Sequence, residues 1–222
     1  MSIDTLNDDE KERLASDDYT TCEQLIALSF DVNPDVRRLT AIHKDIPTDV
    51  LWRLANDPNE DVRAAVASNS RTPPACLDDL SNNHSKYVRA MVANNEKCPI
   101  DILLSLSEDQ NPGVRDMAVQ HENLPFLRLI EIALHDPIPQ VRISAQACAN
   151  DSGVTDESIR NAISTGLSLS ARVGNGHQGE VLGNRLLSEG MLALYQRIQS
   201  LELQAKLPHP TQHLSTTKRF RM

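Results

Sequence analysis

The sequence predicts an all-α fold, a right-handed α-solenoid of about five 26-residue two-helix repeats with a C-terminal capping helix. Three observations lead to this prediction. Val-Arg pairs recur at a fixed spacing, prolines and leucines recur at the same spacing, and only 3% of the residues are aromatic. A core poor in aromatic side chains must be built from aliphatic ones, which pack well between helices.

The repeat is defined by several columns of residues that share one period. The Val-Arg pairs are spaced 26, 26, 26 and 27 residues apart, and the proline and leucine columns keep the 26-residue step. The pairs are Val36-Arg37, Val62-Arg63, Val88-Arg89, Val114-Arg115 and Val141-Arg142. The prolines are Pro47, Pro73, Pro99 and Pro125, and the leucines are Leu51, Leu77, Leu103 and Leu129. So many aligned columns indicate a repeat architecture.

The first helix of each repeat is expected to begin at its proline, because the first helical turn does not need the N–H that proline lacks. In one repeat this helix is expected over about residues 73–80. The first repeat has no such proline. Its sequence Thr-Thr-Cys-Glu offers Thr20 as the N-cap and Glu23 as the reciprocal partner of that cap.

The second helix is expected to begin just before each Val-Arg pair. Val62, Ala65 and Val66 follow the i, i+3, i+4 spacing of a buried helical stripe. Asn69 and Asn95 follow this helix in two repeats, where Asn is expected to adopt the left-handed turn that ends many helices. One repeat has too few apolar side chains to offset the entropy cost of ordering it, so the repeats are expected to fold only as a stack.

The arginine of each Val-Arg pair allows two interpretations. A row of cations along a groove would indicate ligand binding, whereas a structural ladder would pair each arginine with an acid. An Asp, or Asn83 in one repeat, stands six residues before each Arg, so acid and base recur in step and can pair within or between repeats. The sequence therefore favours a structural ladder. Its members are Arg37, Arg63, Arg89, Arg115 and Arg142 with Asp31, Asp57, Asp109 and Asp136.

The stretch DPNEDVRAAVASNSRTPPACLDDL resembles the leucine-rich repeat variant family, a relative of the HEAT repeats. The resemblance covers about residues 20–150 and rests on several of the columns above. It implies short helices, either α or 3₁₀, wound into a curved solenoid. Members of this family with a cysteine-rich N-terminal segment carry an iron–sulfur cluster. No cysteine precedes Cys22 here, so that cluster is not expected.

Composition limits the classes of partner and compartment. The net charge is −9, which disfavours nucleic acid because duplex binding depends on cations that neutralise phosphates. The four cysteines, Cys22, Cys76, Cys98 and Cys148, lack the spacing of metal ligands, so no metal and no cofactor is expected. Unpaired thiols, an acidic N-terminus without a signal-peptide pattern, and no apolar run of about 20 residues favour a cytoplasmic protein without a membrane span.

Four regions are expected along the chain: an acidic N-terminal segment (1–19), the helical repeat solenoid (20–150), a C-terminal helical cap with a Gly-rich hinge (151–207) and a disordered tail (208–222). The hinge contains residues 174–179, which match the Gly-x-Gly-x-x-Gly pattern of phosphate loops. Nothing upstream provides the parallel sheet that such a loop needs, so a flexible hinge is the preferred interpretation.

A longer helix is expected over about residues 180–206. Its apolar residues have the spacing of a coiled-coil seam and are expected to cap the open end of the solenoid. A homodimer through this helix, or binding of a partner helix, is the alternative. The seam residues are Leu187, Met191, Leu194, Ile198 and Leu201.

The sequence contains no catalytic constellation, since it lacks both a Gly-x-Ser-x-Gly elbow and a His-Glu-x-x-His helix. His43 and His121 occupy the column that Asn69 and Asn95 fill in other repeats and are interpreted as helix-end residues. We therefore expect a non-enzymatic protein–protein interaction module or scaffold with a protein partner. An inhibitor or immunity-like protein is one form of this hypothesis.

Four residues are candidates for partner binding. Lys44, Arg71 and Lys97 are expected on one loop edge, which a solvated surface also explains. Trp52, the only tryptophan, is a binding anchor if it is exposed, although the apolar residues of its column also fit packing between repeats. The alternative function is a helical-repeat DNA-binding protein or a DNA glycosylase-like enzyme, which would need a basic groove.

Overall fold

The computed structural model describes residues 3–150, 154–173 and 180–206 of the 222-residue chain. The chain divides into two compact units, Met1–Val154 and Thr155–Met222, which we call the N-terminal unit and the C-terminal unit. Within the described ranges, no helix is both long enough and apolar enough to cross a bilayer.

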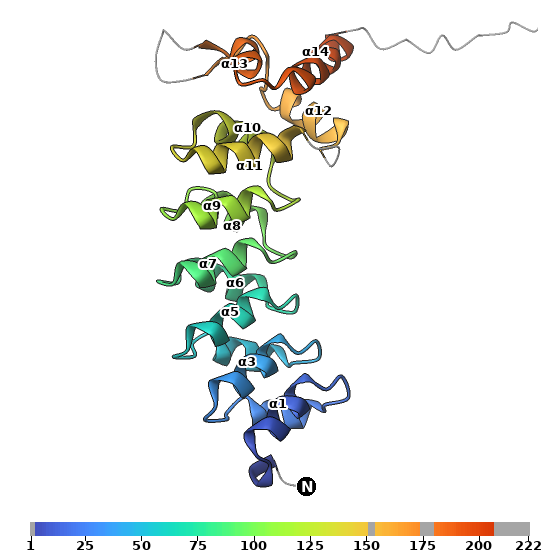
Figure 1. Cartoon of the computed structure of the whole chain (residues 1–222). Coiled ribbons are helices and arrows are strands. Elements are labelled where there is room, and N and C mark those ends of the chain that lie inside the picture. Colours follow the sequence, from blue (N-terminus) through green and yellow to red (C-terminus); the bar gives the residue numbers. More distant parts are fainter. Residues whose placement is uncertain (1–2, 151–153, 174–179, 207–222) are drawn as a thin grey trace, which may run out of the picture. The chain divides into compact units, whose positions relative to one another are not determined.

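The helices of the N-terminal unit form two rows (Figure 1). A short 3₁₀ helix, Ile3–Thr5, precedes them. The inner row is α1 (Asp8–Ser16), α3 (Pro34–Ile42), α5 (Glu60–Ser68), α7 (Lys86–Ala93), α9 (Pro112–Val119) and α11 (Pro139–Asn150). The outer row is α2 (Cys22–Leu28), α4 (Thr48–Leu54), α6 (Pro74–Ser81), α8 (Ile100–Leu106) and α10 (Phe126–His135). Each repeat thus consists of one outer and one inner α-helix.

Successive repeats contact each other mainly along the inner row. Each inner helix contacts the next one, whereas the outer helices mainly contact their inner-row neighbours. The five valines of the Val-Arg pairs are at most 2% exposed, and the leucine column is buried as well. Burial of each such side chain contributes about 1.5–3 kcal/mol, and contact with both neighbours gives every repeat the core that it lacks alone. The predicted all-α solenoid of two-helix repeats is confirmed.

The inner-row helices begin at polar N-caps that keep the same period. In α5, the Asn59 Oδ1 accepts hydrogen bonds from the backbone N–H groups of Asp61 (2.8 Å) and Val62 (3.2 Å). These bonds satisfy donors that the first helical turn leaves without partners. The N-caps of α1, α3, α5, α7 and α9 are Asn7, Asn33, Asn59, Ser85 and Asn111.

The first outer helix differs from its prediction by one residue. The N-cap of α2 is Thr21, which forms a capping box with Gln24, so the predicted box of Thr20 and Glu23 is wrong. Thr20 is buried, and its hydroxyl donates to the Leu14 carbonyl of α1. Thr20 therefore links the start of α2 to α1, and Thr21 caps α2.

The predicted left-handed turn after the inner helices is also wrong. Asn69 has φ −75° and ψ 125°, and no non-glycine residue of the described chain has positive φ. Asn is used at this position for its side chain, which forms hydrogen bonds to the preceding repeat.

The stack begins earlier than the Val-Arg pairs indicate. Helix α1 lies within the predicted acidic N-terminal segment and packs on α3. Lys11 stands one period before Arg37, and its Nζ forms an ion pair with the Asp31 Oδ2 at 2.8 Å. Ala15 of α1 is buried together with Leu28. Helix α1 therefore serves as an additional inner-row helix in register with the others.

The C-terminal unit contains α12 (Asp156–Ser164), α13 (Leu182–Ser188), α14 (Leu192–Lys206) and two short strands. The strands, β1 (Arg172–Val173) and β2 (Glu180–Val181), pair antiparallel. The Gly-rich pattern of the predicted hinge, residues 174–179, falls between these strands in the sequence and lies outside the described residues. The predicted tail, residues 208–222, lies outside them as well.

The single helix predicted over residues 180–206 is wrong, because the chain forms β2, α13 and α14 there. Gly190, with φ 76°, separates the two helices in a conformation that favours glycine. Four seam residues are buried, and only Leu187 is exposed. Helix α14 packs against α12 and α13, which cover the seam within the C-terminal unit. The cap on the solenoid and the homodimer stay predictions.

Candidate functional site

Three arginines of the Val-Arg pairs form bidentate ion pairs with an Asp of the following repeat. The Arg89 Nε and Nη2 lie 2.6 and 2.9 Å from the carboxylate oxygens of Asp109. The Arg89 Nη1 also donates to the Asn83 carbonyl of its own repeat at 2.8 Å. Each such arginine joins two repeats, and its donors are used in doing so. The equivalent pairs are Arg37–Asp57 (2.7 and 2.8 Å) and Arg115–Asp136 (2.7 and 3.0 Å).

The carboxylates of these pairs are held in the ionised form. Burial would raise the pKa of Asp109, but hydrogen bonds from Arg89 and the Asn111 backbone N–H outweigh it, and the pKa lies below its ordinary value. The same balance lowers the pKa of Asp57 and Asp136. The arginine ladder is therefore a structural element between repeats.

Arg63 is the exception, because Asn83 stands where the other repeats have Asp. Its Nη1 still donates to the Asp57 carbonyl at 2.7 Å, and its Nη2 lies 3.4 Å from the His84 Nε2. Its Nε is buried and has no hydrogen-bond partner among the described residues. The Asn83 Oδ1 accepts a hydrogen bond from the Ser85 backbone N–H at 3.1 Å. The other polar atom of this side chain, Nδ2, can only donate, so it offers no acceptor to Arg63.

A second ladder follows the loops that lead from the inner row to the outer row. The Asn95 Nδ2 donates to the Asn69 carbonyl at 3.0 Å, one repeat earlier. The His121 Nε2 lies 2.9 Å from the Asn95 carbonyl, while its Nδ1 accepts from the Asn123 N–H. Each side chain of this column therefore binds the preceding repeat. The equivalent contacts are Asn69 to the His43 carbonyl (3.2 Å) and His43 to the Asp17 carbonyl (3.0 Å).

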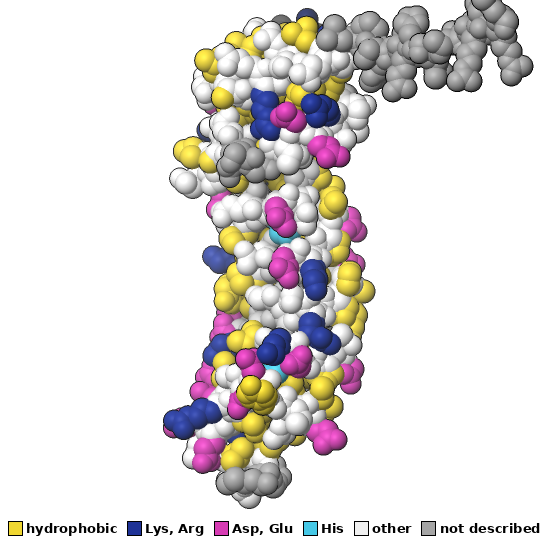
Figure 2. Space-filling view, turned by 90° about the vertical axis from the view of Figure 1, so that its right-hand side faces the viewer, with side chains coloured by type: hydrophobic (Ala, Val, Ile, Leu, Met, Phe, Trp, Pro, Cys, Tyr) yellow, Lys and Arg dark blue, Asp and Glu magenta, His cyan; other side chains and the backbone are white. Residues whose placement is uncertain are grey.

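The three cations predicted to bind a partner lie in these same loops. Lys44, Arg71 and Lys97 are all exposed, and the Lys44 Nζ forms an ion pair with the Asp18 Oδ1 at 2.8 Å. On the face that Figure 2 shows, acidic, basic and apolar side chains are interspersed, without a continuous basic field. The loop edge thus has mixed charge, which does not favour a phosphate-rich ligand.

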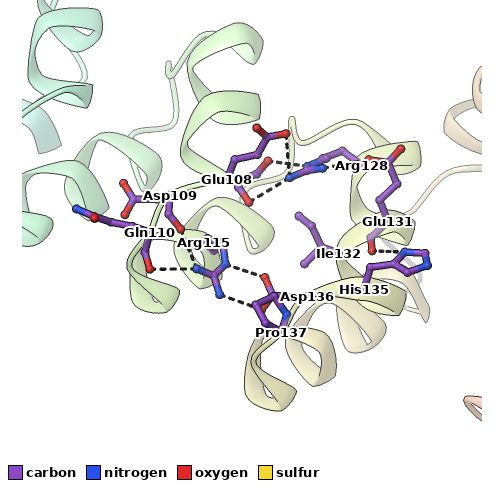
Figure 3. A pocket seen from close by; sticks show the side chains of 11 residues that line it. Glu108, Asp109, Gln110, Arg115, Arg128, Glu131, Ile132, His135, Asp136 and Pro137 are labelled. Atoms are coloured by element: carbon purple, nitrogen blue, oxygen red, sulfur yellow. Dashed lines mark hydrogen bonds and ion pairs between the residues drawn. The ribbon is translucent and has the colours of Figure 1, made fainter. Parts of the chain in front are cut away.

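A groove of about 440 Å³ lies between the loop that joins α8 to α9 and the helix α10 of the next repeat (Figure 3). Arg115 faces Asp136 on one side, while Arg128 on the other side donates to the Ser107 Oγ at 2.8 Å and pairs with Glu108 at 3.3 Å. The charged groups that line the groove thus mainly bind each other. The groove is best explained as the space between two repeats.

The outer row carries the exposed apolar side chains that a binding surface needs. Trp52 of α4 is 37% exposed, and Phe30, just after α2, is 64% exposed. The Arg53 Cζ lies 3.5 Å from the centroid of the Phe30 ring, in a cation–π contact, and its Nη2 donates to the Ser29 hydroxyl. We call Ile26, Phe30, Trp52 and Arg53 the Trp52 surface. It combines the aromatic and arginine side chains that dominate protein interfaces.

The sequence singles out Trp52 as its only tryptophan, but the repeat columns do not mark the other residues of this surface. Phe30 falls in a column that holds Asn56, Asn82 and Glu108 elsewhere, so its apolar character departs from the repeat. That departure was the available signal. A large apolar residue in an otherwise polar column is not required by packing, so it points to an exposed role.

The described residues contain no group of His, Cys, Asp and Glu side chains arranged to hold a metal ion. Burial raises the pKa of the Cys76 thiol to about 11 and that of Cys98 to about 12. Cys22 is exposed. Two of the thiols thus belong to the core of the repeats.

Comparison with known proteins identifies the type of repeat. Among solved structures, the chain is similar to a protein described as a leucine-rich repeat variant with a novel repetitive protein structural motif. The two share 27% sequence identity with a TM-score of 0.52, over 86% of this chain and 67% of that chain. No protein-family model and no curated protein matches the chain. The resemblance to the leucine-rich repeat variant family, which the 26-residue columns predict, is therefore confirmed.

Proposed function

We propose that this protein is a non-enzymatic protein–protein interaction scaffold and that its partner binds the Trp52 surface of the outer row. The observation that carries the proposal is the exposure of Phe30 and Trp52 beside Arg53 in a protein whose other aromatic residues are few. Exposed aromatic side chains next to arginine are typical of the central anchors of protein interfaces. An inhibitor or immunity-like role is a special case in which the partner is the target that the scaffold masks.

The proposal is supported by how the other polar groups are used. The ladder pairs Arg37–Asp57, Arg89–Asp109 and Arg115–Asp136 and the loop histidines hold repeats together. Their chemistry is explained by the fold. The Trp52 surface is not explained in this way, because Phe30 and Trp52 leave much of their area in solvent.

The test is capture of partners from the native host with four forms of the protein. We expect the wild type to retain one or more proteins that Trp52→Ala and Phe30→Ala release. Tyr87→Ala is the matched control, because Tyr87 is an aromatic residue of the inner row with 48% exposure. Far-UV circular dichroism establishes that each variant is folded. Equal retention by all four forms would contradict binding through the Trp52 surface.

The second candidate function, DNA binding or glycosylase-like activity, is favoured only by the helical-repeat architecture. It requires free cations along a groove, whereas three ladder arginines are paired and the net charge is −9. We expect no retention of the protein on heparin at low salt. Tight retention that salt reverses would favour the DNA-binding alternative.

A further inference from the structure

Two columns run side by side along the outer row. In α2, α4 and α8, an acid in the first turn is followed three residues later by an exposed apolar side chain. Residues three apart lie on the same face of a helix, so each of these helices presents a carboxylate beside an apolar group. The pairs are Glu23 with Ile26, Asp49 with Trp52, and Asp101 with Leu104.

Helix α6 also presents a carboxylate, but in the column that holds the apolar residue in the other helices. It has Ala75 in the acid column and Asp78 in the apolar column, with Asp79 beside it, and all three are exposed. The salt bridges of the described residues include none of the acids named for α2, α4, α6 and α8. Each of the first four outer helices therefore exposes at least one carboxylate outside any such pair.

Two arginines lie on the outer row, and one of them, Arg53, also interacts electrostatically with Asp49 of its own helix. Arg53 stacks on the Phe30 ring, and Arg128 pairs with Glu108 and Glu131. Both guanidinium groups are thus already bound within the protein. The exposed carboxylates of α2, α4, α6 and α8 outnumber the single cation of these helices, Arg53, so this part of the outer row has a net negative charge beside its exposed apolar side chains.

The spacing of the repeats fits one kind of occupant. Packed helices lie about 8–10 Å apart, and seven residues of an α-helix rise about 10.5 Å. A helix laid along the stack therefore meets a new repeat about once per heptad. It can place one apolar side chain beside Ile26, Trp52 or Leu104 and one cation beside the neighbouring acid.

We propose that the outer row binds a basic amphipathic helix of a partner protein, which lies along the stack with apolar anchors one heptad apart and Lys or Arg beside them. This proposal rests on the proposed function, since it assigns the partner of the Trp52 surface. Carboxylates repel phosphates and anionic lipids, so a polypeptide cation is the chemistry that the surface complements.

The test uses a synthetic amphipathic helix of about four heptads with Leu anchors and Lys flanks, and the same peptide with Glu in place of Lys. Trp52 is the only tryptophan of the chain, so its emission reports directly on the surface. We expect the Lys peptide to bind, to shift Trp52 emission to shorter wavelength, and to lose affinity as salt rises. The Glu peptide should not bind.

Charge variants distinguish the outer row from general attraction to an acidic protein. Asp49→Lys/Asp101→Lys should weaken binding of the Lys peptide by about tenfold or more, because it removes contacts and adds repulsion. Asp9→Lys/Asp61→Lys is the matched control, since it changes the net charge equally in first turns of the inner-row helices α1 and α5. The control should change the affinity by about twofold at most.

Three outcomes would overturn the proposal: no binding of the Lys peptide, equal binding of both peptides, or equal weakening by both charge variants. Different results would reject the proposed scaffold function. If native proteins are captured in a Trp52-dependent manner while the Lys peptide does not bind, the scaffold stands and the basic helix is excluded. If Trp52→Ala releases no native protein, the scaffold proposal itself fails.

Discussion

Two neighbouring contacts between repeats differ at the acid position of the arginine ladder, which holds Asp109 in one and Asn83 in the other. At the step from α7 to the following repeat, Arg89 holds Asp109 with two hydrogen bonds of 2.6 and 2.9 Å. At the preceding step Asn83 takes the place of the Asp, and the Arg63 Nε is buried with no hydrogen-bond partner among the described residues. Both arginines keep their bond to a carbonyl of their own repeat.

The comparison shows that the Asp of each repeat has two tasks. Its Oδ1 accepts from a backbone N–H two residues later, as Asp109 does from Asn111 at 2.7 Å. Its carboxylate also pairs with the arginine of the preceding repeat. Asn83 performs the first task, with Ser85 at 3.1 Å, but not the second. The turn and the repeat period are therefore maintained between the repeats of Arg63 and Asn83, although no ion pair joins them there.

The largest effect is expected from removing a complete pair. Asp109→Asn leaves Arg89 buried without its carboxylate and should lower the free energy of unfolding by about 3 kcal/mol. Denaturant titration followed by circular dichroism measures the change. Asp101→Asn, an exposed acid of α8, is the control and should change stability by about 0.5 kcal/mol or less. A loss at Asp109 no larger than that of the control would contradict the role of the pair.

The converse change should complete the defective step. Asn83→Asp supplies Arg63 with a carboxylate while keeping the turn, and it should raise the free energy of unfolding by about 2 kcal/mol. Asn82→Asp is the control, because it makes the same substitution one residue earlier at an exposed position. Double substitution with Arg63→Met should remove the gain. A gain that persists without Arg63 would show that another contact produces it.

Acid should weaken the complete steps more than the defective one. Asp57, Asp109 and Asp136 have lowered pKa values in the folded protein, so their stabilisation is present above the unfolded pKa of about 4 and is lost as pH falls through the folded values. Denaturant midpoints should therefore be level near neutral pH and fall below about pH 4. Asp109→Asn should show a shallower acid dependence than the wild type, and an equal dependence would contradict this assignment.

The repeat columns predicted much of the fold, because a stack imposes the same burial on every copy. The valine and leucine columns are buried as their spacing indicates. Helix α1 was missed because Glu10 and Lys11 replace Val and Arg there. Its N-cap Asn7, one period before Asn33, was the signal that remained.

The candidate site was harder to predict, since exposure depends on packing that a column does not specify. Trp52 shares its column with the exposed Ile26 and Leu104 and the buried Ile130, so apolar character alone did not decide its position. In the C-terminal unit, the seam continued through Gly190, which hid the break between α13 and α14. A regular spacing of apolar residues thus predicts which residues are buried, but it does not show that they belong to one continuous helix.

The most direct test of the defective step uses two buried thiols that the chain already provides. Cys76 lies in the repeat of Asn83 and Cys98 next to the repeat of Asp109, and burial raises the pKa of both, so each reacts with a thiol reagent chiefly after local opening. We predict that Cys76 reacts faster than Cys98 in the native wild type. Asn83→Asp should slow Cys76 by about tenfold or more and leave Cys98 nearly unchanged. An unchanged rate at Cys76 would contradict the account that Arg63 and Asn83 form the weak step of the stack.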